Sequence, residues 1–153
     1  MEKLFCYTGK MNESNNRIQL ELHVDDFESI KRYYTALGFR IAWERPPEGF
    51  KGYLVLDMSG NTLCFWAGNQ HVYEQPHFKQ FPKNTPRGYG VEVVVVVDDI
   101  QGYYKTVKDV ANVVEPLIEQ PWGLWDFRAC DPAGYYLRFT SDHDILDPSN
   151  AVE

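Results

Sequence analysis

Residues 17–24 alternate strictly between apolar and polar side chains, the pattern of a strand with one buried face. Residues 27–37 then follow a helical period, with Asp25 or Asp26 as the N-cap and Gly38 after the last turn. Alternating, β-forming segments follow, and they predict further strands at 39–44, 53–57 and 62–66. The first part of the chain therefore predicts one β-α-β-β-β unit.

The second half of the chain repeats this order. Patterning predicts a strand at 90–97, a helix at 100–110 capped by Asp99, and strands at 113–118, 125–130 and 135–140. The motif DxxGxxLxF begins at Asp57 and again at Asp131, 74 residues later, and Val24-Asp-Asp recurs at Val97, 73 residues later. Two motifs that share one offset indicate that a single unit has been duplicated. The alternative is a chance match between common strand-turn-strand patterns.

This duplication predicts an α+β protein of two modules within one domain overall. Residues 17–68 form the first module and residues 90–141 the second. Residues 69–89 are polar, aromatic and proline-containing, so they are interpreted as a linker that could carry a short helix or a lid. Residues 142–153 are polar and acidic, and we expect them to fray.

Charge and cysteine content narrow the function classes. The net charge is −7 and no basic stripe is present, which argues against nucleic acid as a partner and weakly favours cationic ligands. The 3 cysteines lack CxxC spacing, as expected for a reduced, cytoplasmic protein. No apolar run has membrane-spanning length, and residues 1–16 lack the order of a signal peptide, so no membrane association is expected.

The region around the last hairpin carries a recognisable signature: Gln120-Pro121-Trp122-Gly123, Phe127, Asp131-Pro132-Ala133-Gly134 and Phe139. Together with the duplication, it resembles the vicinal oxygen chelate (glyoxalase/bleomycin resistance protein/dioxygenase) superfamily over residues 17–140. Within it, the signature is most similar to bleomycin-resistance-type proteins. The resemblance implies a curved mixed sheet around a cleft, a homodimer, and drug binding without chemical change.

The resemblance also implies where superfamily enzymes hold a divalent metal, with one side chain from the first and one from the last strand of each module. Those positions here are Gln19, Cys64, Glu92 and Arg138. Glu92 is a good ligand and Gln19 an acceptable one, but a guanidinium only donates hydrogen bonds and cannot ligate. We therefore expect no metal and no cofactor, with an Arg138–Glu92 ion pair in the metal's place. The alternative is a pair that merely closes the strand ladder.

Strand alternation then selects the side chains that share the predicted cleft. The ligand-binding residues expected there are Gln19, Glu21, His23, Cys64, Trp66, Glu92, Trp122, Trp125, Tyr136 and Arg138. His23 is interpreted as a hydrogen-bonded wall residue rather than a base, and Trp122 as a stacking surface for a flat ligand or cation. His71 and His77 are only a weak metal signal. Alternatively, part of this face meets solvent or another subunit.

Three hypotheses remain open at this point. The first is a cytoplasmic, dimeric protein of the bleomycin-resistance type that sequesters a planar, cationic, antibiotic-like molecule without chemistry. The second is a metal-dependent lyase, isomerase or dioxygenase of the same superfamily with a rearranged ligand set. The third is a non-catalytic interaction module without a working cleft.

Overall fold

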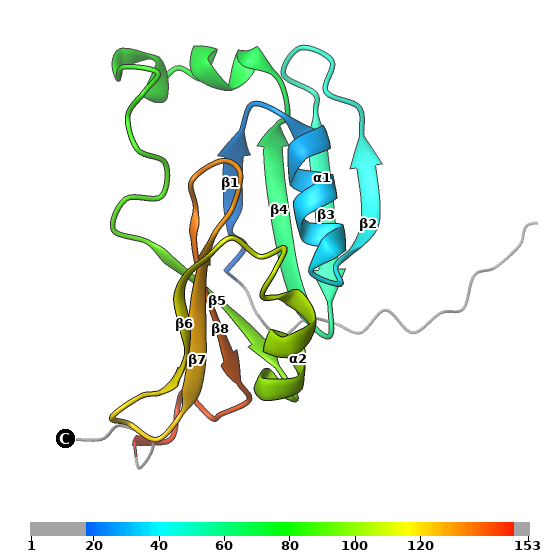
Figure 1. Cartoon of the computed structure of the whole chain (residues 1–153). Helices are drawn as coiled ribbons and strands as arrows, with labels where there is room; N and C mark the ends of the chain where they lie inside the picture. Colours follow the sequence, from blue (N-terminus) through cyan, green and yellow to red (C-terminus); the bar gives the residue numbers. More distant parts are fainter. Residues whose placement is uncertain (1–17, 149–153) are drawn as a thin grey trace, which may run out of the picture.

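The computed structural model describes residues 18–148, and it contains the two expected modules (Figure 1). The first module comprises β1 (Glu21–Val24), α1 (Phe27–Ala36), β2 (Arg40–Arg45), β3 (Tyr53–Met58) and β4 (Asn61–Ala67). Two 3-10 helices follow, η1 (Gln70–Glu74) and η2 (Phe78–Gln80). The second module comprises β5 (Glu92–Val97), α2 (Ile100–Val107), β6 (Val113–Glu119), β7 (Trp125–Cys130) and β8 (Tyr136–Ser141).

Each module forms a four-stranded mixed sheet, and the two sheets have the same strand order. The first runs β1-β4-β3-β2 and the second β5-β8-β7-β6. In both, the first strand pairs in parallel with the last, and the other pairs are antiparallel. The predicted α+β fold of two β-α-β-β-β modules is confirmed, and the shared topology supports the duplication.

The helix caps follow the sequence signals. Asp26 accepts hydrogen bonds from the backbone N–H of Glu28 and Ser29, at 2.9 and 3.3 Å, and satisfies two of the unpaired donors in the first turn of α1. Gly38 follows the helix with a φ of 98°, which favours glycine. The second helix is shorter than predicted, because a turn closes where the N–H groups of Val110 and Ala111 both donate to the Val107 carbonyl.

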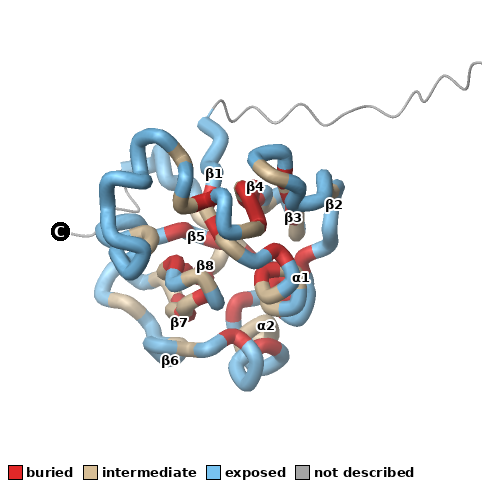
Figure 2. The backbone as a smooth tube through the Cα atoms, turned by 90° about the horizontal axis from the view of Figure 1, so that it is seen from above, coloured by how far each residue is buried: buried red, intermediate tan, exposed pale blue. Residues whose placement is uncertain are grey.

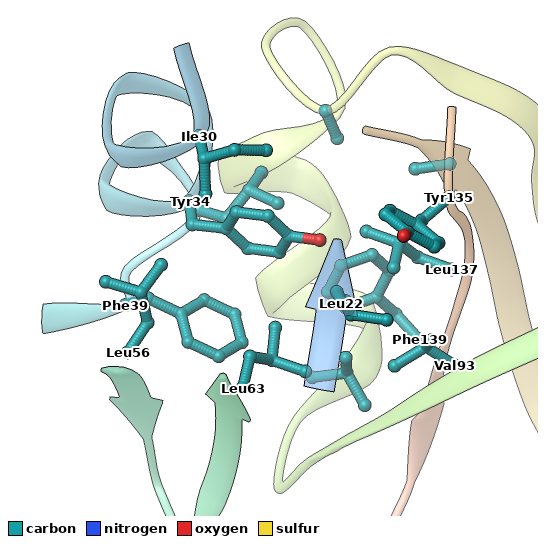
Figure 3. Close-up of a cluster of buried hydrophobic side chains, with 14 of the residues drawn as sticks. Leu22, Ile30, Tyr34, Phe39, Leu56, Leu63, Val93, Tyr135, Leu137 and Phe139 are labelled. Atoms are coloured by element: carbon teal, nitrogen blue, oxygen red, sulfur yellow. The ribbon is translucent and has the colours of Figure 1, made fainter. Parts of the chain in front are cut away.

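Both helices lie inside the angle between the two sheets, so they share one core (Figure 2). Buried side chains from both modules form a single cluster there, and Figure 3 shows Tyr34 of the first module pointing toward the side of the cluster where Tyr135 and Leu137 of the second module lie. The Tyr34 hydroxyl donates to Asp131 Oδ2 across the modules at 2.9 Å. The opposite faces of the sheets consequently look outward, in different directions.

Two side chains fasten the modules together in a reciprocal way. Asn61 bonds the N–H and C=O of Val96 on β5, and Tyr135 bonds the N–H and C=O of His23 on β1. Asn61 and Tyr135 are 74 residues apart, and His23 and Val96 are 73 apart, so the contacts obey the duplication. Each side chain satisfies backbone groups on an edge strand, which would otherwise remain unpaired.

The apolar face differs from the prediction at the start of each module. Alternation over residues 17–24 and 90–97 predicts that Ile18, Leu20 and Val91 belong to the apolar face that packs against the helices, but they are 82%, 42% and 48% exposed. These residues lie before the strands, because β1 pairs with β4 only from Glu21 onward and the Val91 N–H donates to the Gly88 carbonyl in a turn. Helical spacing over residues 100–110 likewise predicts that Val110 faces inward, but it is exposed because it follows the end of α2.

The linker is ordered rather than structureless. Asn69 caps η1 by accepting from the His71 N–H at 2.9 Å, and Val72 is buried beneath it. The Tyr73 hydroxyl donates to Asp25 Oδ2 at 2.7 Å and ties the linker to the β1–α1 loop. Arg17 and the part of the predicted frayed tail at 149–153 lie outside the described residues. Within 18–148, no helix is both long and apolar enough to cross a membrane.

Candidate functional site

Strand alternation gives each sheet an outward polar face opposite its helix. The first face comprises side chains of the first module: Gln19, Glu21, His23, Trp43, Tyr53, Cys64 and Trp66. The second face comprises Glu92, Glu115, Asp126, Arg128, Tyr136 and Arg138, with Trp122 beside it. Both faces contain predicted cleft residues, and they differ sharply in chemistry.

The first face is aromatic and largely uncharged. Gln19 Nε2 donates to the Tyr53 hydroxyl at 3.0 Å and lies 3.6 Å from Cys64 Sγ. Trp43 stacks on Tyr53, with ring centroids 5.3 Å apart and planes inclined by 15°. Burial, followed by hydrogen bonds with Cys64 and Glu21, raises the pKa of Tyr53 well above its ordinary value. The phenol is therefore neutral at physiological pH and presents a hydroxyl beside an exposed indole.

His23 lies at the edge of the first face as a wall residue. Its ring packs 4.9 Å from Trp66 and 5.2 Å from Phe78, centroid to centroid. Burial lowers its pKa, the nearby Glu21 charge opposes that shift, and the Arg87 charge adds to it. His23 is therefore neutral near pH 7. Its Nδ1 is buried and has no hydrogen-bond partner among the described residues.

The second face is an ion network built around Asp126, whose side chain is fully buried. Gln120 Nε2 and Arg128 Nη1 both donate to Asp126 Oδ1 at 2.7 Å. Arg138 Nε lies 3.2 Å from Asp126 Oδ2, but without the alignment of a hydrogen bond. One buried carboxylate therefore holds two guanidinium groups, since a lone buried charge would be costly.

Arg128 links this carboxylate to two more acids. Its Nε donates to Glu92 Oε1 at 3.0 Å, and its Nη1 lies 3.4 Å from Glu115 Oε2. Burial alone would lower the pKa of Arg128, but the hydrogen bond to Glu92 and the charges of its three acidic neighbours raise it. Tyr136 donates to Glu115 at 2.9 Å and extends the network.

The predicted Arg138–Glu92 ion pair is wrong. The strand register explains why the partners differ from the prediction. Arg138 lies opposite Val94 on β5 and opposite Arg128 on β7, so the two arginines are neighbours. Arg128 pairs with Glu92, and Arg138 pairs with Asp126.

The two tryptophans near the last hairpin have different environments. Trp122 lies in the β6–β7 turn, is 36% exposed, and has the Arg138 guanidinium 5.8 Å from its ring centroid. Trp125 lies on the same side of β7 as Phe127 and packs against the core. We therefore place Trp122 beside the second face and correct the placement of Trp125, because alternation turns it toward the helices.

The side chains at the four superfamily metal positions do not suit a divalent ion. Gln19 and Cys64 are in contact on the first face, whereas Glu92 and Arg138 lie on the second, where Arg138 offers only donors. No group of three or more His, Cys, Asp or Glu residues capable of holding a metal occurs within residues 18–148, and this includes the surroundings of His71 and His77. We therefore derive no step through a metal.

An open cavity of about 730 Å³ lies over the second face. Glu92, Glu115, Arg128 and Tyr136 line it, together with Gln120, Ile118 and the end of the linker. Figure 2 shows that the sides of the two sheets that lie away from the helices look in different directions.

The chain belongs to the Glyoxalase/Bleomycin resistance protein/Dioxygenase superfamily. The family model matches residues 17–139, nearly the whole of both modules. No curated protein matches the chain.

Solved structures of superfamily members have a similar fold. A bleomycin resistance determinant encoded on the transposon Tn5 is 21% identical with a TM-score of 0.60, over 84% of this chain and 99% of that one. A bleomycin-binding protein complexed with bleomycin is 20% identical with a TM-score of 0.56, over 84% and 99%. Lactoylglutathione lyase from Agrobacterium tumefaciens is 14% identical with a TM-score of 0.56, over 84% and 95%. At these identities the similarity shows only a shared fold. The similar structures include both a binding protein and an enzyme.

Sequence reasoning missed five residues of the two faces: Trp43, Tyr53, Glu115, Asp126 and Arg128. Asp126 and Arg128 alternate with Phe127 in β7, so the alternation of that strand already carried the signal for two outward charges. Trp43 and Tyr53 were harder to find, because their stacking depends on a register shift between β2 and β3 near Ile41 and Trp43.

Proposed function

We propose that this protein is a cytoplasmic small-molecule binding protein of the bleomycin-resistance type, which sequesters a planar, cationic, antibiotic-like ligand without metal or chemistry. The observation that carries the proposal is the pair of unlike faces. One is mainly aromatic around Trp43 and Tyr53, and the other is an ion network beside Trp122 and a 730 Å³ cavity. A cleft with aromatic walls and a few fixed polar groups suits small-molecule recognition.

The charge of the two faces supports a cationic ligand. The second face carries three carboxylates, at Glu92, Glu115 and Asp126, against the two guanidinium groups of Arg128 and Arg138. Glu21 adds a carboxylate to the first face beside Tyr53. Exposed aromatic rings next to a net negative surface attract flat cations through stacking and cation–π contact.

The proposal includes a homodimer whose clefts combine the first face of one chain with the second face of the other. Within one chain these faces look in different directions, so a cleft with both walls requires a second copy (Figure 2). A two-fold axis would form two such clefts at once. Light scattering should then give a mass near twice the 17.8 kDa of the chain, and a monomer at micromolar concentration would contradict this part of the proposal.

A bleomycin-binding protein complexed with bleomycin is one structural neighbour, so a bleomycin-like glycopeptide is the natural first probe. It should be titrated, with a panel of planar cations, into wild type and Trp122→Ala. Loss of stacking on the order of 1–2 kcal/mol predicts a roughly five- to thirty-fold weaker affinity in the variant. Val110→Ala is the control, because Val110 is similarly exposed but follows α2 on the helix side.

Two outcomes would contradict the aromatic contact. If Trp122→Ala leaves the affinity for a confirmed ligand unchanged while its melting temperature falls sharply, Trp122 is structural. If no planar cation binds wild type, the proposed ligand class is wrong.

The alternative function is that of a metal-dependent enzyme, and a lyase is among the similar solved structures. The metal content of the purified protein distinguishes this alternative from the binding protein. Purified protein should contain no stoichiometric Zn, Ni, Fe or Mn, and EDTA should leave its melting temperature unchanged, because Arg138 occupies a ligand position and is bound to Asp126. Elemental analysis close to one metal per chain would favour the metal-dependent enzyme instead.

A further inference from the structure

A further cavity, of about 420 Å³, lies between β1 and the linker, and it shares Pro86, Arg87, Gly88 and Val91 with the lining of the cavity over the second face. We propose that it binds a small apolar anion, such as a mono- or bicyclic aromatic carboxylate. Its lining comes from β1, η1, η2 and the chain that leads into β5. The lining includes Leu22, His23, Val72, Tyr73, Phe78, Phe81, Lys83, Arg87 and Val91.

The body of the cavity is apolar. Leu22 and Val72 are almost fully buried at its wall, while Phe78 and Phe81 are about half exposed. Val91, which was expected in the core, instead contributes an exposed apolar surface here. A cavity of this volume with mainly hydrophobic and aromatic walls has the size and character of a ligand site.

Two cations gather on one ring of the lining. Lys83 Nζ lies 4.9 Å and Arg87 Cζ 5.1 Å from the Tyr73 ring centroid. Neither forms an ion pair with any residue in the range 18–148. Two cations beside one ring, neither with an ion-pair partner, favour an anion, and a carboxylate accepts hydrogen bonds from both kinds of group.

Two acids lie near this site, and both are engaged. Glu21 lines the cavity, and its carboxylate interacts with the Tyr53 hydroxyl and lies 3.7 Å from His23 Nε2. Asp25 accepts a hydrogen bond at 2.7 Å from the hydroxyl of Tyr73, the ring that both cations flank. With Glu21 counted against Lys83 and Arg87, the lining keeps one net positive charge. The cavity over the second face is lined by as many carboxylates as guanidinium groups, Glu92 and Glu115 against Arg87 and Arg128, so the linker cavity is the more favourable of the two for an anion.

His23 contributes a neutral ring to the lining of the cavity. Its Nδ1 is fully buried, so the ring and not this nitrogen is what a ligand meets. Burial and the Arg87 charge lower the pKa of His23, and therefore the ring binds in its neutral form.

The test uses three naphthalene probes of one shape, carrying a carboxylate, a hydroxymethyl or an aminomethyl group, titrated by calorimetry. The carboxylate should bind saturably and at least about tenfold more tightly than the alcohol, and the amine should bind most weakly. Lys83→Gln with Arg87→Gln should remove the preference for the carboxylate. Lys79→Gln is the matched control, since Lys79 lies in the same linker but does not line this cavity.

Three results would overturn the inference: no saturable binding of the carboxylate, equal affinity for carboxylate and alcohol, or an unchanged preference in the double variant. Trp122→Ala separates this site from the proposed cleft. It should leave the carboxylate affinity unchanged, and a loss there would show that the anion binds the arginines of the second face instead. Because the cleft is tested with cations, failure of either proposal leaves the other standing.

Discussion

The two modules share one backbone plan but carry different chemistry on their outward faces. Val55 lies opposite Cys64 in the first sheet, and Arg128 lies opposite Arg138 in the second. The register therefore makes Val55 equivalent to Arg128 and Cys64 equivalent to Arg138. By the same register, Tyr53 stands where the second module has Asp126.

The inward faces have diverged much less. Leu63 and Phe65 of β4 match Leu137 and Phe139 of β8, and all four are buried in the common core. Core positions must fill a shared volume in which unpaired polar atoms are costly, so duplication preserves their apolar character. The outward positions lack that constraint. Their side chains are mainly aromatic in the first module and mainly ionic in the second.

The largest expected effect comes from removing the central charge of the ionic face. Asp126→Asn should lower the free energy of unfolding by about 3 kcal/mol, because it leaves Arg128 and Arg138 half-buried without their shared carboxylate. Tyr53→Phe, at the equivalent position of the aromatic face, should cost less than about 1 kcal/mol. Urea denaturation measures both, and equal losses would contradict the contrast between the faces.

A smaller effect is expected where the modules are alike. Tyr135→Phe removes the hydroxyl that pairs with the N–H and C=O of His23, and it should cost about 1–2 kcal/mol. Asn61→Ala, which unpairs Val96, should cost a similar amount. Tyr89→Phe, on a fully exposed ring, is the control. A large loss in only one of the two variants would show that the reciprocal contacts are not equivalent.

The smallest effect is the pH dependence that His23 adds to the first module; the equivalent position in the second module is Val96, which does not titrate. The folded pKa of His23 is lowered, so its stabilising contribution is present above the unfolded value near 6.5 and is lost as pH falls from there through the folded pKa. His23→Gln should flatten the stability profile in that window. If the melting temperature of His23→Gln changes with pH between 5 and 7 as steeply as that of wild type, another group is responsible for the titration.

The fold was predictable because duplication and patterning agree with each other. Two motifs at one offset and two capped amphipathic helices sufficed for the modules and their order. The first residues of β1 and β5 could not be predicted from the sequence. The apolar–polar alternation already includes Ile18, Leu20 and Val91, but pairing with a neighbouring strand begins only after them.

The candidate site was only partly predictable. Parity along one strand placed Cys64 and Arg138 on outward faces, but a pairing such as Arg138–Glu92 also depends on which strand flanks β8 on the side away from β5. That strand is β7, and its Arg128 and Asp126 take both partners. The linker cavity could not be predicted from the sequence. Lys83 and Arg87 approach the Tyr73 ring because of the path of an irregular segment, and no sequence pattern specifies that path.

The central claim is that the unlike faces meet across two chains, and a mixed dimer tests it most directly. One chain carries Trp43→Ala on the first face, the other carries Trp122→Ala at the second, and different affinity tags allow the mixed dimer to be isolated. Each homodimer should bind the planar cation weakly. The mixed dimer should contain one fully intact cleft, and calorimetry should give half the wild-type number of sites at wild-type affinity. If the mixed dimer binds as weakly as both homodimers, the two faces do not meet across two chains, and the account is contradicted.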